Sequence, residues 1–234
     1  MTHLTGPERA SYVQDMFTRI AARYDAMNRL MTAGQDAVWR REVIRRAALP
    51  PGVGLVLDLG AGTGDLSFDA LQQNPGSRAI AADFTLQMMR IGQQRFDDPF
   101  LSWSAVDALH IPFPENTFDA VISGFLLRNV IDVSQALAEQ YRVLKPGGRI
   151  VSLDTTKPRP GLLAPFIRFH MHTVIPALGK LLTGEAEAYT YLPDSSENFL
   201  LAEDLAAKMS SAGFGDVNFR RRMFGVVAIH WGEK

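Results

Sequence analysis

The sequence predicts an α/β fold in which a seven-stranded, mostly parallel sheet carries helices on both faces. Strand and helix patterns alternate between residues 55 and 154, as a parallel sheet with right-handed crossovers requires. A glycine-rich turn follows the first apolar run, at residues 60–64. At the end of the chain, Phe224 and Gly225 separate two short strands closely enough for an antiparallel hairpin. We therefore expect strands at residues 55–59, 78–82, 101–105, 118–123, 149–154, 217–223 and 226–230.

The expected helices lie before and between these strands. Residues 8–30 and 36–48 place apolar side chains every three or four positions, which is the period of an amphipathic helix. Asp132 can cap a further helix, and the last one lies near residues 202–212. Packing on the core explains the apolar stripe of the first helix. Its polar residues 24–28 leave open a second interpretation, a lid that closes over a bound cofactor.

Composition limits the chemistry of the chain. Its 234 residues suffice for one α/β domain with additions, and a formal net charge of −1 gives no general electrostatic reason to bind nucleic acid. The absence of cysteine excludes disulfides and thiolate metal sites, and the five histidines show no metal-ligand spacing, so we expect no metal. The sequence shows neither a signal peptide nor an apolar run of membrane-spanning length, which predicts a cytoplasmic chain.

The first predicted strand and the turn after it organise the rest of the chain. The strand contains Asp58, and the turn holds Gly60, Gly62 and Gly64, which allow a tight bend and leave room for a ligand. A dinucleotide fingerprint needs glycine where this chain has Asp65, and the two carboxylates would repel a pyrophosphate. They suit a ligand with a positive centre and no phosphate, such as S-adenosylmethionine.

Polar or small residues end the neighbouring strands. Asp83 follows the second strand, where an acidic residue can accept both hydroxyls of a ribose. Asp107 and Ala108 follow the third strand, where they can meet an adenine amino group, and the fourth ends at Ser123 and Gly124. The sequence leaves open which of the last two contacts the ligand. The carboxyl ends of parallel strands share one edge, so these residues and the glycine turn predict one nucleoside site.

Longer motifs carry a family resemblance over nearly the whole chain. They are residues 17–28, 60–65, 112–119, 127–130 and 141–148. With these motifs the chain resembles the class I S-adenosylmethionine-dependent methyltransferases, and among them the menaquinone/ubiquinone C-methyltransferases of quinone biosynthesis. The Tyr-Asp-x-Met-Asn and Leu-Arg-Asn-Val segments are the most particular to the quinone group. The chain departs from the family after the fifth strand, where it has Leu-Asp-Thr-Thr in place of Leu-Glu-Phe-Ser.

The resemblance implies a single Rossmann-like domain, the cofactor S-adenosylmethionine, and C-methylation of a reduced polyprenyl quinone, from demethylmenaquinol to menaquinol. The family's cofactor contacts carry over to Thr63, Asp83, Asp107 and Ala108. The implied segments of the domain, residues 1–234, are an N-terminal helical lid (1–50), a cofactor-binding core (51–154), a substrate-lid insertion (155–200), and a C-terminal helix with the strand hairpin (201–234).

Methyl transfer to carbon needs a nucleophilic carbon and a dry, apolar site. Arg128 stays protonated at any working pH, so we expect it to stabilise a phenolate; a salt bridge to a carboxylate of the same loop is the alternative. The proton-accepting candidates are Asp154, His170, His172 and Tyr189, and we expect Arg128, Asp154 and Tyr189 in the catalytic set. The expected substrate-binding residues are Tyr24, Asn28, Asn129, His170 and Tyr191.

An apolar run within the insertion, at residues 162–182, is not used by the strand–helix alternation. It predicts either a simple core helix or an apolar channel for an isoprenoid tail, with transient membrane-surface contact by a peripheral protein at the inner face. The expected partner is a polyprenyl quinol, with no nucleic acid, and a homodimer is left open. Two other functions stay open: methylation of another phenolic or lipid-like molecule, and a non-catalytic cofactor-binding scaffold.

Overall fold

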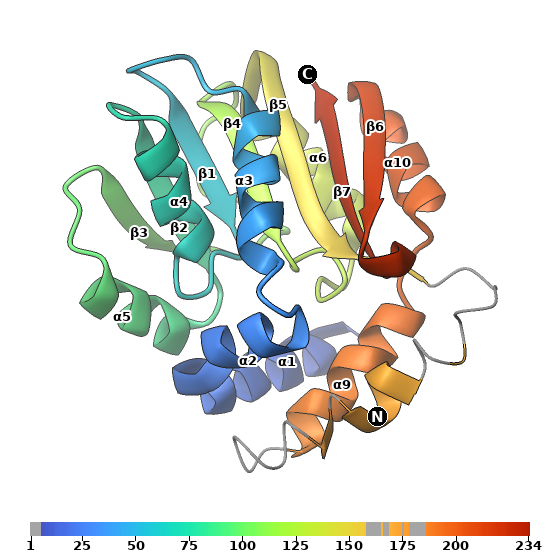
Figure 1. The fold of residues 1–234 in the computed structure, drawn as a ribbon. Helices are drawn as coiled ribbons and strands as arrows, with labels where there is room; N and C mark the ends of the chain where they lie inside the picture. The colour runs from blue at the N-terminus through green and yellow to red at the C-terminus, as the bar shows by residue number, and fades with distance from the viewer. Residues whose placement is uncertain (1–5, 158–164, 166–168, 175, 178–185) are drawn as a thin grey trace.

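The computed structural model describes residues 6–157, 165, 169–174, 176–177 and 186–234 (Figure 1). Its helical elements are α1 (Gly6–Ile20), η1 (Ala21–Arg23), α2 (Tyr24–Met31), α3 (Asp36–Ala47), α4 (Asp65–Gln73), α5 (Leu86–Arg95), α6 (Val133–Val143), η2 (His170–Val174), α9 (Ala186–Glu197), α10 (Ala202–Ser211) and η3 (Met223–Gly225). Its strands are β1 (Leu55–Leu59), β2 (Arg78–Asp83), β3 (Leu101–Ala105), β4 (Phe118–Gly124), β5 (Leu144–Thr155), β6 (Gly215–Arg222) and β7 (Val227–Glu233).

One seven-stranded sheet has the order β3-β2-β1-β4-β5-β7-β6. The pairs from β3 to β5 are parallel, whereas β7 runs antiparallel to both of its neighbours, β5 and β6. The last strand of the chain therefore inserts inside the sheet, and β6 forms the edge. The mixed, mostly parallel sheet and the C-terminal hairpin confirm the predicted fold class.

Helices cover both faces of the sheet (Figure 1). Successive residues of β1 point to opposite faces, so Val56 packs with α3 and α4 while Leu57 packs with α6 and α10. Trp39 of α3 and Leu137 of α6 are among the fully buried side chains of the two core layers. The carboxylate of Asp132 accepts a hydrogen bond from the amide of Gln135 at 3.0 Å, which confirms this residue as the cap of α6.

The predicted helix over residues 8–30 is divided in the structure. The short turn η1 separates α1 from α2, so that Ile20 and Met27, on either side of it, reach one apolar cluster with Met88 of α5. Helices α1, α2 and α9 lie beyond the carboxyl ends of the parallel strands (Figure 1). Across the described ranges, no helix is both long and apolar enough to cross a membrane.

Candidate active site

The glycine turn joins β1 to α4 and forms one wall of the site. The amides of Gly60 and Ala61 both donate to the carbonyl of Ala82 in β2, at 2.8 and 3.0 Å. Gly60 has a φ of +73°, and a Cβ at this position would lie 2.9 Å from Cδ1 of Leu126. A larger residue would therefore be strained in its backbone and would displace the leucine, which explains the need for glycine here.

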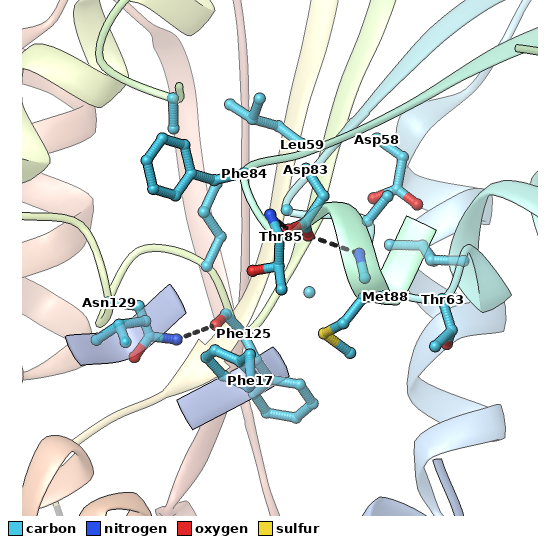
Figure 2. Close-up of a pocket in the computed structure, with 18 of the residues that line it drawn as sticks. Phe17, Asp58, Leu59, Thr63, Asp83, Phe84, Thr85, Met88, Phe125 and Asn129 are labelled. Carbon is cyan, nitrogen blue, oxygen red and sulfur yellow. Dashed lines mark hydrogen bonds between the residues drawn. The ribbon is translucent and has the colours of Figure 1, made fainter. Parts of the chain in front are cut away.

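Asp83 binds the turn to the end of β2. Its Oδ2 accepts a hydrogen bond from the amide of Gly62 at 2.7 Å, and its Oδ1 accepts one from the amide of Thr85 at 2.6 Å (Figure 2). The side chain is only 9% exposed; burial raises the pKa of this carboxyl, and the two amides oppose the rise. Each carboxylate oxygen has a second lone pair, so Asp83 can still accept hydroxyl groups of a ligand.

Asp58 lies in β1, one residue before the strand ends, and is fully buried. Its Oδ2 accepts a hydrogen bond from Oγ of Ser67 at 2.6 Å, whereas its Oδ1 has no hydrogen-bond partner among the described residues. Burial raises the pKa of this carboxyl to about 7. A buried polar atom without a partner is unfavourable, and a ligand cation in the adjoining cavity would relieve that penalty.

A cavity of about 250 Å³ lies between the glycine turn and the N-terminal helices. The turn and the ends of β1, β2 and β4 form one side, and α1 and α2 form the other. Metal-binding groups of three or more acidic or histidine residues do not occur in the part of the chain that the structure describes. The predicted site residues that line the cavity are Tyr24, Asn28, Asp58, Gly60, Gly62, Thr63, Asp83, Asp107, Ala108, Gly124 and Asn129.

The other predicted site residues do not line the described cavity. Of the pair left open by the sequence, Gly124 faces the cavity, whereas Ser123 is buried in the sheet and donates to Oγ of Ser152 at 3.2 Å. His172 is exposed and pairs with Glu197 at 2.9 Å. The side chains of His170 and Tyr189 lie outside the described residues. The lining also does not include three further predicted residues, Arg128, Asp154 and Tyr191.

Arg128 and Asp154, two of the predicted catalytic residues, bind each other. Nη1 of Arg128 lies 2.7 Å from Oδ1 of Asp154, and the two side chains are 4% and 1% exposed. The amide of Arg128 also donates to Oδ2 of Asp154 at 3.2 Å. Nε of Arg128 is buried and finds no acceptor in the described chain. The structure thus contains the salt bridge that the sequence left open as an alternative. Its carboxylate belongs to β5, however, and not to the loop of Arg128.

Asn129 directly follows Arg128 in the chain, and it lines the cavity. Its Nδ2 donates to the carbonyl of Phe125 at 3.0 Å (Figure 2), and its Oδ1 accepts a hydrogen bond from the hydroxyl of Tyr191 at 3.1 Å. Burial raises the pKa of the Tyr24 phenol, and the charge of Arg128 and a hydrogen bond with Asn28 oppose this rise. The polar end of the cavity is thus a set of neutral hydrogen-bonding groups close to the buried ion pair of Arg128 and Asp154.

Three further residues lie around the glycine turn, although no motif in the sequence indicates them. Met88 of α5 lines the cavity, and a Cβ on Gly62 would lie 3.2 Å from its Cε. On the same helix, a Cβ at Gly92 would lie 2.6 Å from the carbonyl oxygen of Thr63, so only glycine lets α5 approach the turn this closely. Arg95, at the end of α5, forms ion pairs with Asp25 of α2 and with Asp65, which directly follows the turn. Only the three-dimensional structure shows that these residues lie beside the turn.

Known proteins are similar in sequence to this chain over nearly its whole length. A sequence profile of the ubiE/COQ5 methyltransferase family matches residues 5–234. The chain belongs to the ubiE/COQ5 methyltransferase family. A ubiquinone/menaquinone biosynthesis C-methyltransferase UbiE of Desulfotalea psychrophila is 46% identical over 222 residues, which are 95% of this chain and 90% of that protein. A demethylmenaquinone methyltransferase of Thermus thermophilus is 42% identical over 221 residues, 94% of this chain and 100% of that protein.

Solved structures share the fold of this ubiE/COQ5 family member. A putative S-adenosyl-L-methionine-dependent methyltransferase of Methanococcus maripaludis has a TM-score of 0.64 at 20% identity and 93% coverage of both chains. The [4+2]-cyclase SpnF has a TM-score of 0.69 at 18% identity, over 95% of this chain and 94% of that chain. Because a cyclase shares the fold, the fold alone does not fix the reaction.

Family membership confirms the predicted enzyme class, an S-adenosylmethionine-dependent methyltransferase. The chemistry of the cavity fits this cofactor. Asp83 offers acceptors for ribose hydroxyls, and the unpartnered oxygen of Asp58 suits an ammonium group. Within the described lining, the one basic side chain is Arg40, and it already binds Asp36 and Asp69, at 2.7 and 2.6 Å. The lining therefore offers no free cation for a pyrophosphate.

The position of Asp58 predicts a pH-dependent cofactor affinity. With a pKa of about 7, this carboxyl is mostly neutral at pH 6.0 and mostly ionised at pH 7.5. Because only the ionised form attracts an ammonium, titration calorimetry of wild type should show S-adenosylhomocysteine affinity rising about five- to tenfold over this range.

The control for this measurement is Asp58→Asn, which retains an acceptor for Ser67 but does not ionise. Any titration of the ligand itself is common to both proteins, so the difference between their pH profiles isolates the carboxyl. Parallel profiles for the two proteins would contradict a role of Asp58 as the partner of the ammonium.

Proposed function

We propose that this enzyme methylates a ring carbon of a reduced polyprenyl quinone, converting demethylmenaquinol to menaquinol. The observation that carries the proposal is the similarity to a named demethylmenaquinone methyltransferase over 94% of this chain and 100% of that protein. The relative named for both ubiquinone and menaquinone biosynthesis makes the benzoquinol ring the alternative substrate. The cavity supports either ring, since polar groups occupy only part of its lining.

The chain's contribution is to bind, orient and desolvate the reactants. Bound S-adenosylmethionine supplies a methyl group: the methyl–sulfur bond of its sulfonium breaks as the methyl bonds to the ring carbon, and that carbon then loses its proton so that the ring regains its aromatic form. Asp83 and the glycine turn fix the nucleoside, and Phe17, Met88 and Val130 among the lining residues keep water away from the reacting atoms. Such alignment of two reactants can contribute about 7–11 kcal/mol to lowering the barrier.

We propose that Arg128 favours the reactive, ionised form of the quinol from behind the cavity wall. A ring carbon becomes a nucleophile when the adjacent phenol loses its proton, and nearby positive charge stabilises the resulting phenolate. Tyr24 is itself a phenol at the cavity, and the charge of Arg128 opposes the rise of its pKa. We infer that the same charge lowers the pKa of the substrate phenol. Asn28 and Asn129 then supply neutral contacts that orient the ring.

We also propose a transient contact with a membrane surface, from which a long-tailed quinol would enter. Most of the apolar run at residues 162–182 lies outside the described residues. In the described part, Phe224 is 80% exposed in η3, and Phe169 is exposed as well. Val227 at the start of β7 pairs with Thr155 at the end of β5, so η3, which directly precedes β7, lies near the carboxyl end of β5. The cavity lies at the same end of the parallel strands.

The proposed function is tested by offering labelled S-adenosylmethionine with a panel of short-tailed acceptors under reducing conditions. The panel comprises a demethylmenaquinol, the benzoquinol precursor of ubiquinone, and a simple phenol. We expect methylation of the naphthoquinol ring, and none when the same quinone is offered oxidised, because the oxidised ring has no phenol to ionise. Methylation of the phenol without either quinol would overturn the proposal, and preference for the benzoquinol would reassign the ring.

A substitution that keeps the charge of Arg128 tests whether the placement of that charge by the guanidinium is needed for turnover. Arg128→Lys retains the positive charge, but an ammonium cannot reproduce the planar donor geometry of the guanidinium. We expect unchanged cofactor affinity and a kcat lower by about 10²–10³-fold, the usual effect of losing one positioned electrostatic donor. Arg78→Lys, at an exposed position at the start of β2, is the matched control. A folded Arg128→Lys enzyme that turns over within about twofold of wild type would contradict the role.

A further inference from the structure

Asp25 of α2 connects the N-terminal helices to the glycine turn. Its Oδ1 accepts a hydrogen bond from the hydroxyl of Thr63 at 2.8 Å, and its Oδ2 forms an ion pair with Arg95 of α5. The second arm of Arg95 reaches Oδ1 of Asp65, the first residue of α4, at 2.7 Å. Three segments far apart in the sequence therefore meet at one carboxylate.

The packing of α5 makes this meeting possible. Gly92 lies one helical turn before Arg95, and a Cβ there would lie 2.6 Å from the carbonyl oxygen of Thr63 and 2.1 Å from Cη2 of Trp103. Glycine thus allows α5 to lie directly against the turn. Because residues three apart share a face of a helix, this approach also brings the guanidinium of Arg95 to the turn.

The helices that Asp25 connects to the turn form the opposite wall of the cavity. Tyr24 and Asn28, on either side of Asp25 in α2, line the cavity together with Phe17 of α1. The resemblance to the family predicts Thr63 as a cofactor contact, yet its hydroxyl is donated to the N-terminal helices. The bond between Asp25 and Thr63 spans these two walls directly, beside the apolar cluster that packs Phe17 and Met27 on Met88 of α5.

We propose that Asp25 is a positioning residue, a latch that holds α1 and α2 closed over the bound cofactor and sets how fast the cofactor leaves. The proposal rests on the cofactor of the proposed function and not on its quinol substrate. The latch acts on the enclosed complex, so opening it accelerates dissociation and weakens affinity. The latch does not touch the reacting atoms, so it affects KM for the cofactor more than kcat.

The test is a double-mutant cycle on the dissociation rate of S-adenosylhomocysteine, measured by stopped-flow displacement. Asp25→Ala and Thr63→Val should each raise the rate about tenfold, the loss expected for one charge-assisted hydrogen bond. The double variant should be no faster than the faster single variant, since both remove the same interaction. Asp15→Ala, at an exposed carboxylate of α1, should stay within about twofold of wild type. Unchanged single variants, or rates that multiply in the double variant, would overturn the latch.

Hydrogen exchange of the cofactor-free protein gives an independent measurement. In Asp25→Ala the amides of α2 should exchange about tenfold faster, while those of α6, on the far face of the sheet, keep their wild-type rates. Faster exchange throughout the chain would mean that Asp25 only supports the fold. Asp25→Asn, which retains the acceptor for Thr63, should restore part of the protection of α2. If wild type failed to bind S-adenosylhomocysteine, the cofactor assignment would fail, while the exchange result would still decide the latch.

Discussion

Two hydrogen bonds, donated by backbone amides to the carboxylate of Asp83, hold the site together. Asp83 accepts hydrogen bonds from Gly62 of the turn and from Thr85 before α5, and this fixes the turn against the end of β2. The glycines permit the bend, but the buried carboxylate determines where the bend lies. It also leaves acceptor sites toward the cavity, so the group that holds the backbone is the group that can receive a ribose.

The enclosure of the cavity follows from that fixed turn. Thr63 and Asp65, on the same turn, are bound to Asp25 and Arg95, and these contacts hold the N-terminal helices and α5 around the cavity. Behind the polar end of the cavity, Arg128 and Asp154 form a buried ion pair. Removing one member of such a pair leaves an uncompensated buried charge, so both residues are constrained by stability as well as by chemistry.

The sequence predicted features that depend on local pattern. Strand–helix alternation predicted the sheet, and the polar residues at strand ends identified Asp83 and Asp107 as cavity residues, because the carboxyl ends of parallel strands lie side by side. At the end of the fourth strand the sequence left Ser123 and Gly124 open, and only the structure shows that Gly124 lines the cavity. Contacts between distant segments had no such signal. The partner of Arg128 lies in another strand, and the contribution of Gly92 depends on the approach of a helix to the turn. The break between α1 and α2 depends on tertiary packing, which overrode a continuous helical pattern.

The central claim is that the carboxylates around this glycine turn select a nucleoside with a positive centre over a dinucleotide. Titration calorimetry of the wild-type protein at pH 7.5 with S-adenosylmethionine and with NAD⁺ measures this selection directly. We predict that S-adenosylmethionine binds at least about 100-fold more tightly, since Asp58 attracts its ammonium and would repel a pyrophosphate. Equal affinity for NAD⁺ would contradict the account of the turn.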